Sequence, residues 1–148
     1  MRKSRPNDDG QMMVMILGFV AVALLVATVM IGITAVYLEH KRLLSLADGA
    51  SLAAADSFTL GEVESHGGSP SAVLNPARVR NVAADFVARS PAAERFDALA
   101  VAGATGSPDG STAVVVLTAA VHPPVVNFLV PDGIPIEATS TARSRLTR

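Results

Sequence analysis

A run of apolar side chains near the N-terminus dominates the hydropathy pattern. Residues 12–38, MMVMILGFVAVALLVATVMIGITAVYL, hold no charged side chain over 27 positions. At ~1.5 Å per residue a helix of this length is roughly 40 Å long, whereas the hydrocarbon core of a bilayer is ~30 Å thick. The Val, Ile, Leu and Phe side chains together favour insertion by about 4 to 8 kcal/mol. The pattern predicts a polar leader over 1–10 and a single transmembrane helix over 11–38, with the lipid bilayer as its first partner.

The helical period continues beyond the apolar run. Apolar or small side chains recur at the three- and four-residue spacing of one helix face. They are Leu43, Leu46, Ala47, Ala50, Ala53, Ala54 and Phe58. Gly61 is a natural helix terminator. We therefore expect the transmembrane helix to continue as an amphipathic helix over 39–60.

A second, shorter helix follows a loop. Residues 62–74 contain Gly, Ser and Pro, which is typical of a loop. Asn75 is a favourable N-cap residue, and Pro76 suits the first helical position because its φ angle is already set. Apolar side chains then recur with helical period until Val87, and Pro91 ends the pattern.

The period changes from 3.6 to 2 in the last third of the chain. Residues 96–101 form a weak alternating segment, and residues 112–121 and 134–143 form strong ones. The sequence therefore predicts an α+β fold. The long helix and the short helix pack on one face of a small antiparallel sheet, and residues 61–148 form a small α+β extracytoplasmic domain.

Composition argues against several functions. The net charge of −1 leaves no electrostatic footprint for nucleic acid, and the chain has no Trp, only one Tyr and only five Phe for base stacking. The absence of Cys excludes disulfides and thiolate zinc sites. The three His lack metal-ligand spacing, and neither a nucleophile elbow nor a phosphate-binding glycine loop occurs. We expect no enzyme activity, no metal or other cofactor, and no nucleic-acid partner.

Basic residues near the ends of the span predict its orientation. Arg2, Lys3 and Arg5 precede the span, and Lys41 and Arg42 follow it. The small excess favours a cytoplasmic N-terminus, because Lys and Arg are enriched in cytoplasmic segments. Signal peptides have apolar regions of only about 7–15 residues, so we expect no signal cleavage. The predicted location is the cytoplasmic (inner) membrane, with the C-terminal domain extracytoplasmic.

Two groups of residues are candidate contact sites. Ala23 with Ala27, and Gly49 with Ala53, have the spacing that lets helices approach closely. They form either a homo-oligomer or subunit seam, or a chance pattern of an Ala-rich sequence. The segment VVNFLV either closes the core or forms an exposed partner patch. Its apolar members are Val125, Val126, Phe128, Leu129 and Val130.

Several N-terminal features occur together. A charged leader ends in Asp8-Asp9-Gly10, an uncharged helix follows at once, and residues 46–55 read LADGASLAAA. In these features the chain resembles the TadE-like and TadG-like proteins of the Flp (tight adherence, Tad) pilus assembly and secretion systems.

The resemblance implies a non-enzymatic, minor-pilin-like or pseudopilin-like subunit held in the membrane, with other pilus or secretion subunits as partners. It also implies a candidate processing junction between Gly10 and Gln11, because a prepilin signature has Gly before the apolar helix. That signature has Glu at the fifth mature position, where this chain has Met15. Processing at this junction and a plain flexible junction both stay open. The alternative function is a bitopic membrane protein whose ectodomain binds a cell-wall component or another membrane protein.

Overall fold

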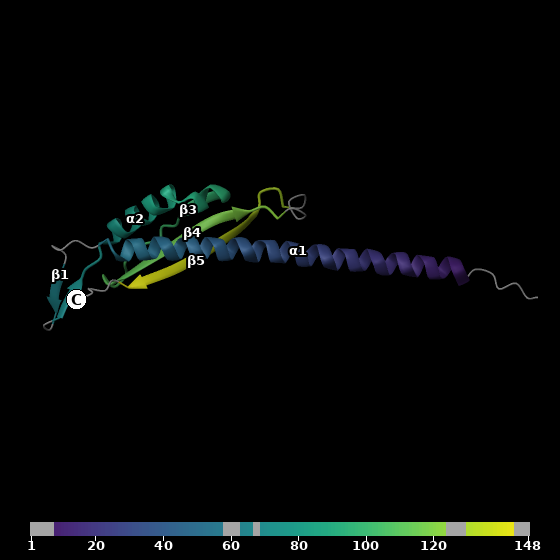
Figure 1. Ribbon diagram of the computed structural model, residues 1–148, viewed down its shortest axis with the longest axis horizontal. Helices are drawn as coiled ribbons and strands as arrows, with labels where there is room; N and C mark the ends of the chain where they lie inside the picture. The colour runs from purple at the N-terminus through teal and green to yellow at the C-terminus, as the bar shows by residue number, and fades with distance from the viewer. Residues whose placement is uncertain (1–7, 58–62, 67–68, 124–129, 144–148) are drawn as a thin grey trace, which may run out of the picture.

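The longest element is one helix that joins the apolar span to the rest of the chain. The computed structural model describes residues 8–57, 63–66, 69–123 and 130–143. The helix, α1 (Asp8–Ala55), has 48 residues and carries a small domain on its C-terminal half (Figure 1). The other elements are β1 (Val63–His66), β2 (Ser69–Ala72), α2 (Pro76–Arg89), the 3-10 helix η2 (Pro91–Arg95), β3 (Asp97–Val101), β4 (Thr112–Val121) and β5 (Ile134–Arg143). The predicted α+β class is confirmed.

α1 continues beyond the apolar run, but its bounds differ from the expected 11–60. It begins three residues earlier and ends at Ala55 instead of Leu60. At its end the N–H of Ser57 donates to the Ala54 carbonyl at 3.2 Å, and the Ser57 hydroxyl donates to the same oxygen at 2.6 Å. Such local bonds tighten the last turn and compete with further helical bonds. The sequence pattern missed this stop because it followed apolar spacing as far as Phe58, which lies outside the described residues.

α2 begins and ends as predicted. The Asn75 side-chain oxygen accepts hydrogen bonds from the N–H groups of Ala77 at 2.9 Å and Arg78 at 3.3 Å. Pro76 occupies the first helical position, and the helix stops before Pro91. Val79, Ala83 and Val87 are buried. The capped, amphipathic helix expected from the sequence is therefore present.

The segment expected to be a loop over 62–74 contains a hairpin instead. β1 and β2 pair antiparallel, with Val63 opposite Ala72 and His66 opposite Ser69. Sequence reasoning missed it because four-residue strands rich in Ser, Glu and Pro lack the alternating apolar pattern that identifies longer strands.

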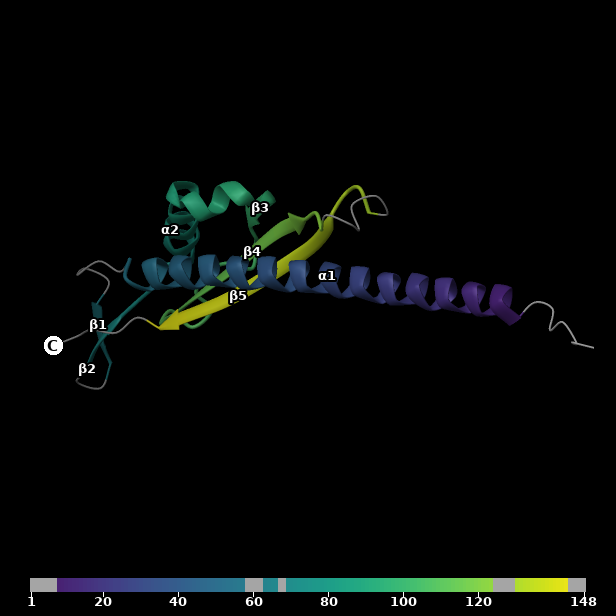
Figure 2. The ribbon, with the colours of Figure 1, turned by 45° about the vertical axis from the view of Figure 1, so that its right-hand side comes forward.

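The main sheet has the order β3-β4-β5 and is antiparallel throughout. β4 and β5 pair over their whole length, from Thr112 opposite Arg143 to Val121 opposite Ile134. α1 packs against β4, β5 and α2 (Figures 1 and 2). The buried strand residues include Val115, Leu117, Ala119, Val121, Ile136, Ala138 and Ala142. These are apolar positions that the alternation predicted.

The face of α1 that meets the sheet is built from small side chains. Leu43, Leu46, Ala47, Ala50 and Ala54 are all buried in the core. The Ser51 and Ser140 hydroxyl oxygens lie 3.1 Å apart, which joins α1 to β5. Short side chains let the helix axis approach the strands closely, so the helix and the sheet form one packed unit.

We predict that Asn75→Ala lowers the free energy of unfolding of the full chain in detergent by about 1 kcal/mol, because two N–H groups lose their acceptor. Denaturant unfolding measures this change. Asn81→Ala is the matched control, because Asn81 is exposed on the same helix and Ala is the better helix former. Equal losses in the two variants would show that the cap does not stabilise α2.

The Asp109 carboxylate organises the turn before β4. It accepts hydrogen bonds from the N–H of Ser111 at 2.9 Å, and from the hydroxyl at 2.8 Å and the N–H at 2.7 Å of Thr112. These bonds, with that from the Ser111 N–H the largest cause, hold the pKa of Asp109 well below its usual range. A carboxyl with a lowered folded-state pKa stabilises the fold above the unfolded-state pKa of ~3.9.

We therefore predict that the wild type loses more stability than Asp109→Asn when the pH falls from 7 towards 3. The stabilisation is complete above the unfolded-state pKa and disappears as the pH falls through the folded-state pKa. Unfolding of both proteins across this pH range measures the difference. Asp85→Asn, at an exposed position of α2, should follow the wild-type profile.

Candidate functional site

The N-terminal half of α1 extends from the domain as an isolated apolar rod (Figure 1). Its large apolar side chains between Met12 and Ile31 are between 46% (Val20) and 75% (Phe19) exposed. Within the described ranges, α1 is the one helix long and apolar enough to cross a membrane. A bilayer removes such a surface from water, which is favourable. The single N-terminal apolar helix indicates a single-pass membrane protein.

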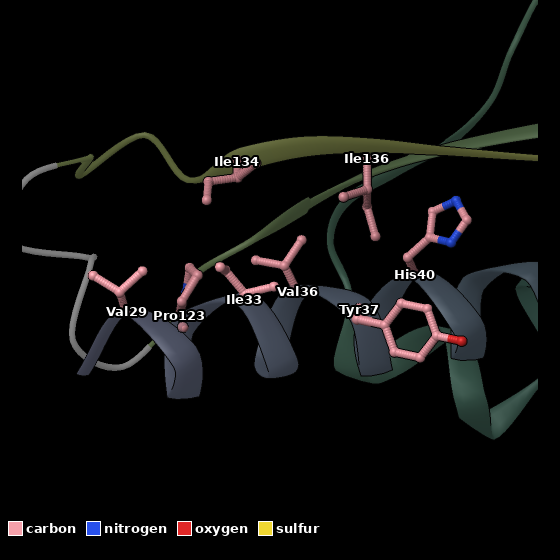
Figure 3. A pocket seen from close by; sticks show the side chains of 9 residues that line it. Val29, Ile33, Val36, Tyr37, His40, Pro123, Ile134 and Ile136 are labelled. Atoms are coloured by element: carbon pink, nitrogen blue, oxygen red, sulfur yellow. The ribbon is translucent and has the colours of Figure 1, made fainter. Parts of the chain in front are cut away.

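A cleft of about 510 Å³ lies where this rod meets the domain. One wall is the α1 segment between Val29 and His40, and the other is the end of the sheet where β4 stops and β5 begins. In Figure 3, Ile134 and Ile136 face Ile33 and Val36 across the cleft. The complete lining is Val29, Gly32, Ile33, Val36, Tyr37, His40, Pro123, Ile134 and Ile136. We call this the juxtamembrane cleft.

Strand register and one polar contact position the cleft. Val121 pairs with Ile134, so the residues just after β4 and those that start β5 lie at the same end of the sheet. His40 Nε2 lies 3.0 Å from the carbonyl oxygen of Glu137, which holds α1 beside β5 at that end. Sequence reasoning placed residues 29–37 in lipid on every side. It missed the cleft because the period of a helix does not reveal which strand end will meet it.

A polar cluster lies near the same end of the domain. Arg42 forms an ion pair with Glu39, and the Arg95 guanidinium lies 3.9 Å from the same carboxylate. His122 Nδ1 lies 3.1 Å from Asp97 Oδ2. The sequence offered no carboxylate near His122. The pairing of β3 with β4 brings Asp97 there, because Asp97 is opposite Ala120 in the sheet.

This cluster has the character of a surface ion-pair group. The Asp97 side chain is 76% exposed, and solvent weakens ion pairs at such positions. Across the described ranges, no group of three or more His, Asp or Glu is placed to hold a metal ion. Ion pairs this exposed contribute little to the stability of the domain.

The candidate helix-packing residues divide into two pairs. Gly49 faces α2, and a Cβ built on it would lie 2.7 Å from the Phe86 ring carbon Cζ, so this glycine permits a contact within the chain. Ala53 is half-buried. Ala23 and Ala27 are both exposed on the isolated rod, where another helix has access to them. A seam between subunits stays a prediction for either pair.

The remaining candidate residues are those of the processing junction at the start of the span and those of the VVNFLV segment between β4 and β5 in the sequence. Gly10 and Gln11 are exposed and already helical, because α1 begins at Asp8. Of the predicted partner patch, Val130 is 38% exposed. Val125, Val126, Phe128 and Leu129 lie outside the described residues. Processing at the junction and partner binding by the patch stay predictions.

The comparison with protein families identifies the N-terminal helix. Residues 10–57 match the family model described as "Putative Flp pilus-assembly TadE/G-like". These residues form a TadE/G-like segment that covers about a third of the chain. The TadE/G-like segment coincides with α1 and the two residues after it, so it contains both the exposed rod and the face that packs on the sheet. No curated protein and no solved structure matches the chain.

We predict that Gly49→Leu lowers the free energy of unfolding by about 1–3 kcal/mol, because the added side chain overlaps the Phe86 ring. The double variant with Phe86→Ala should lose less than the sum of the single losses, since it vacates that space. Gly18→Leu is the matched control, because nothing lies within 4 Å of a Cβ built there. Thermal unfolding in detergent of the wild type and all four variants measures these losses. Purely additive losses would contradict the contact.

Proposed function

We propose that the protein is a non-enzymatic, membrane-anchored subunit of a Tad/Flp-type pilus assembly or secretion apparatus, with a minor-pilin-like or pseudopilin-like role. One observation carries this proposal. The TadE/G-like match coincides with a single helix whose first half is apolar and unburied and whose second half is the core of a domain. Such a helix fixes a small binding domain directly on a membrane anchor.

The mechanism is assembly. A helix of 48 residues is roughly 70 Å long, so it spans a bilayer and still supports the domain on its remaining length. The sheet packs on that helix without an intervening linker, so the domain is held close to the membrane surface. The exposed Ala23 and Ala27 on the rod and Val130 at the edge of the domain are the surfaces that we assign to partner subunits.

The proposed location is the cytoplasmic (inner) membrane, with the N-terminus inside and the domain outside. The support is the distribution of basic residues. Three of them precede the span, and only Lys41 and Arg42 follow it closely. We retain the division into a leader over 1–10, a span over 11–38 and a domain over 61–148, with the helix extension ending at Ala55.

We predict that the full chain, expressed in its host, stays in carbonate-washed membranes and co-purifies with identified pilus-assembly membrane proteins. Ala23→Leu combined with Ala27→Leu should weaken this co-purification, because larger side chains keep helices apart. Ala21→Leu is the matched control, since it adds the same side chain at another exposed position of the rod. Quantitative mass spectrometry of the purified complexes measures the change.

Two results would count against this function, and a third against the Ala23 and Ala27 seam alone. Recovery of the intact chain as a folded monomer in the soluble fraction removes the anchor. Membrane recovery with cell-wall polymers, and without pilus subunits, supports the alternative bitopic wall-binding protein. Equal co-purification of the two-site variant and the control removes the Ala23 and Ala27 seam. Intact mass of the membrane form then distinguishes a chain cut between Gly10 and Gln11 from a permanent uncut anchor.

A further inference from the structure

We propose that the juxtamembrane cleft binds one acyl chain of a bilayer phospholipid. The inference rests on the proposed membrane anchoring and adds a defined ligand site to it. The cleft lies on the same helix as the rod, and its lining is apolar apart from His40 and the hydroxyl of Tyr37. In water a hollow of this kind is an exposed apolar surface, whereas acyl chains fill it in a membrane.

The depth of the cleft follows from the length of the apolar run. The 27 uncharged residues form a rod of roughly 40 Å, which exceeds the ~30 Å of hydrocarbon. At the outer end, the Lys41 ammonium lies 5.7 Å from the centre of the Tyr37 ring. Tyr is enriched at the membrane interface, and Lys extends its charge from there towards the headgroups. These preferences place Tyr37 at headgroup level. The α1 wall from Val29 to Val36 then lies among the acyl chains of the outer leaflet.

The domain reaches the same depth. Pro123, Ile134 and Ile136 line the cleft opposite α1 (Figure 3), so the end of the sheet descends to the level of the last turns of the span. Pro123 is among the fully buried side chains, and Ile136 is 9% exposed. Core packing therefore fixes these two residues of the domain-side wall.

The shape and lining of the cleft suit an acyl chain. The α1 wall from Val29 to His40 is about 16 Å long at ~1.5 Å per residue. An extended acyl chain can lie along a groove of this length, and its contacts with the wall would be almost entirely apolar, as the lining is. A second copy of this chain is the competing occupant, and the experiment below distinguishes the two.

The cleft opens sideways onto the lipid-facing surface. Val29 and Ile33 line it and are still 50% and 65% exposed, like Leu25 one turn earlier on the rod. A lipid in the outer leaflet therefore enters without leaving the bilayer. Its phosphate would lie near Lys41, one turn beyond Tyr37, where the ammonium supplies a compensating charge.

Native mass spectrometry of the full chain, extracted from membranes in mild detergent, tests the site. The wild type should retain one phospholipid. Ile33→Phe places a larger side chain in the cleft, and displacement of about two methylene groups weakens retention about tenfold. Ile31→Phe is the matched control, because Ile31 is 57% exposed and is not among the lining residues. It changes the composition of the rod identically and should retain the lipid.

Tyr37 provides a second readout that does not depend on a lipid surviving extraction with the protein. It is the only Tyr, and the chain has no Trp, so tyrosine fluorescence reports this one position. In vesicles of phosphatidylcholine with brominated acyl chains, the Tyr37 emission should be quenched. Ile33→Phe should reduce the quenching, and Ile31→Phe should leave it unchanged.

The outcomes separate this inference from the function on which it rests. If the chain is not an integral membrane protein, the proposed function and the lipid site both fail. If it is membrane-integral but Ile33→Phe and Ile31→Phe retain lipid equally and are quenched equally, only the lipid site is overturned. A third outcome also overturns the lipid site. If the wild type is a dimer without retained lipid and Ile33→Phe is a monomer, a second copy of the chain occupies the cleft.

Discussion

The structure depends on one helix that is in contact with two different surroundings. Up to the cleft, the first half of α1 has no neighbour among the described residues and presents large apolar side chains on all sides, so it needs lipid. The second half presents a stripe of Leu and Ala to the sheet, with charged side chains such as Asp48 exposed on other faces. No linker separates the two halves. The membrane therefore fixes the direction of the helix, and the helix fixes the position of the domain.

Small side chains make this arrangement possible. Ala47, Ala50 and Ala54 allow α1 to lie directly on the strands, and Gly49 leaves room for Phe86 of α2. Each of these residues contributes little apolar area by itself, so stability comes from close contact over a long helix. The two Ala on the rod have the same small size but lack a neighbour among the described residues. Their surface remains available to another helix.

Much of this architecture follows from local patterns in the sequence. The Asn75-Pro76 cap, the alternation in β4 and β5 and the helical stripe after residue 39 each satisfy backbone or apolar groups locally, so a short window reveals them. The β1–β2 hairpin and the end of α1 at Ala55 were not predicted, because they depend on weak local bonds without an apolar pattern. The juxtamembrane cleft and the Asp97–His122 pair were not predicted either, because each requires the pairing of distant strands.

The two surroundings of α1 also explain why the junction is the most informative part of the molecule. A rod in lipid alone needs only apolar side chains, and a domain in water needs only a packed core. Where the end of the sheet lies beside the span, side chains such as Ile33 and Ile134 line one surface that the rod and the domain share. Water is a poor solvent for such a surface, and the described part of the core does not close over it. An apolar surface that is left open at the level of the acyl chains is stable because lipid removes it from water. The fold of the domain therefore determines how deep the domain lies in the membrane.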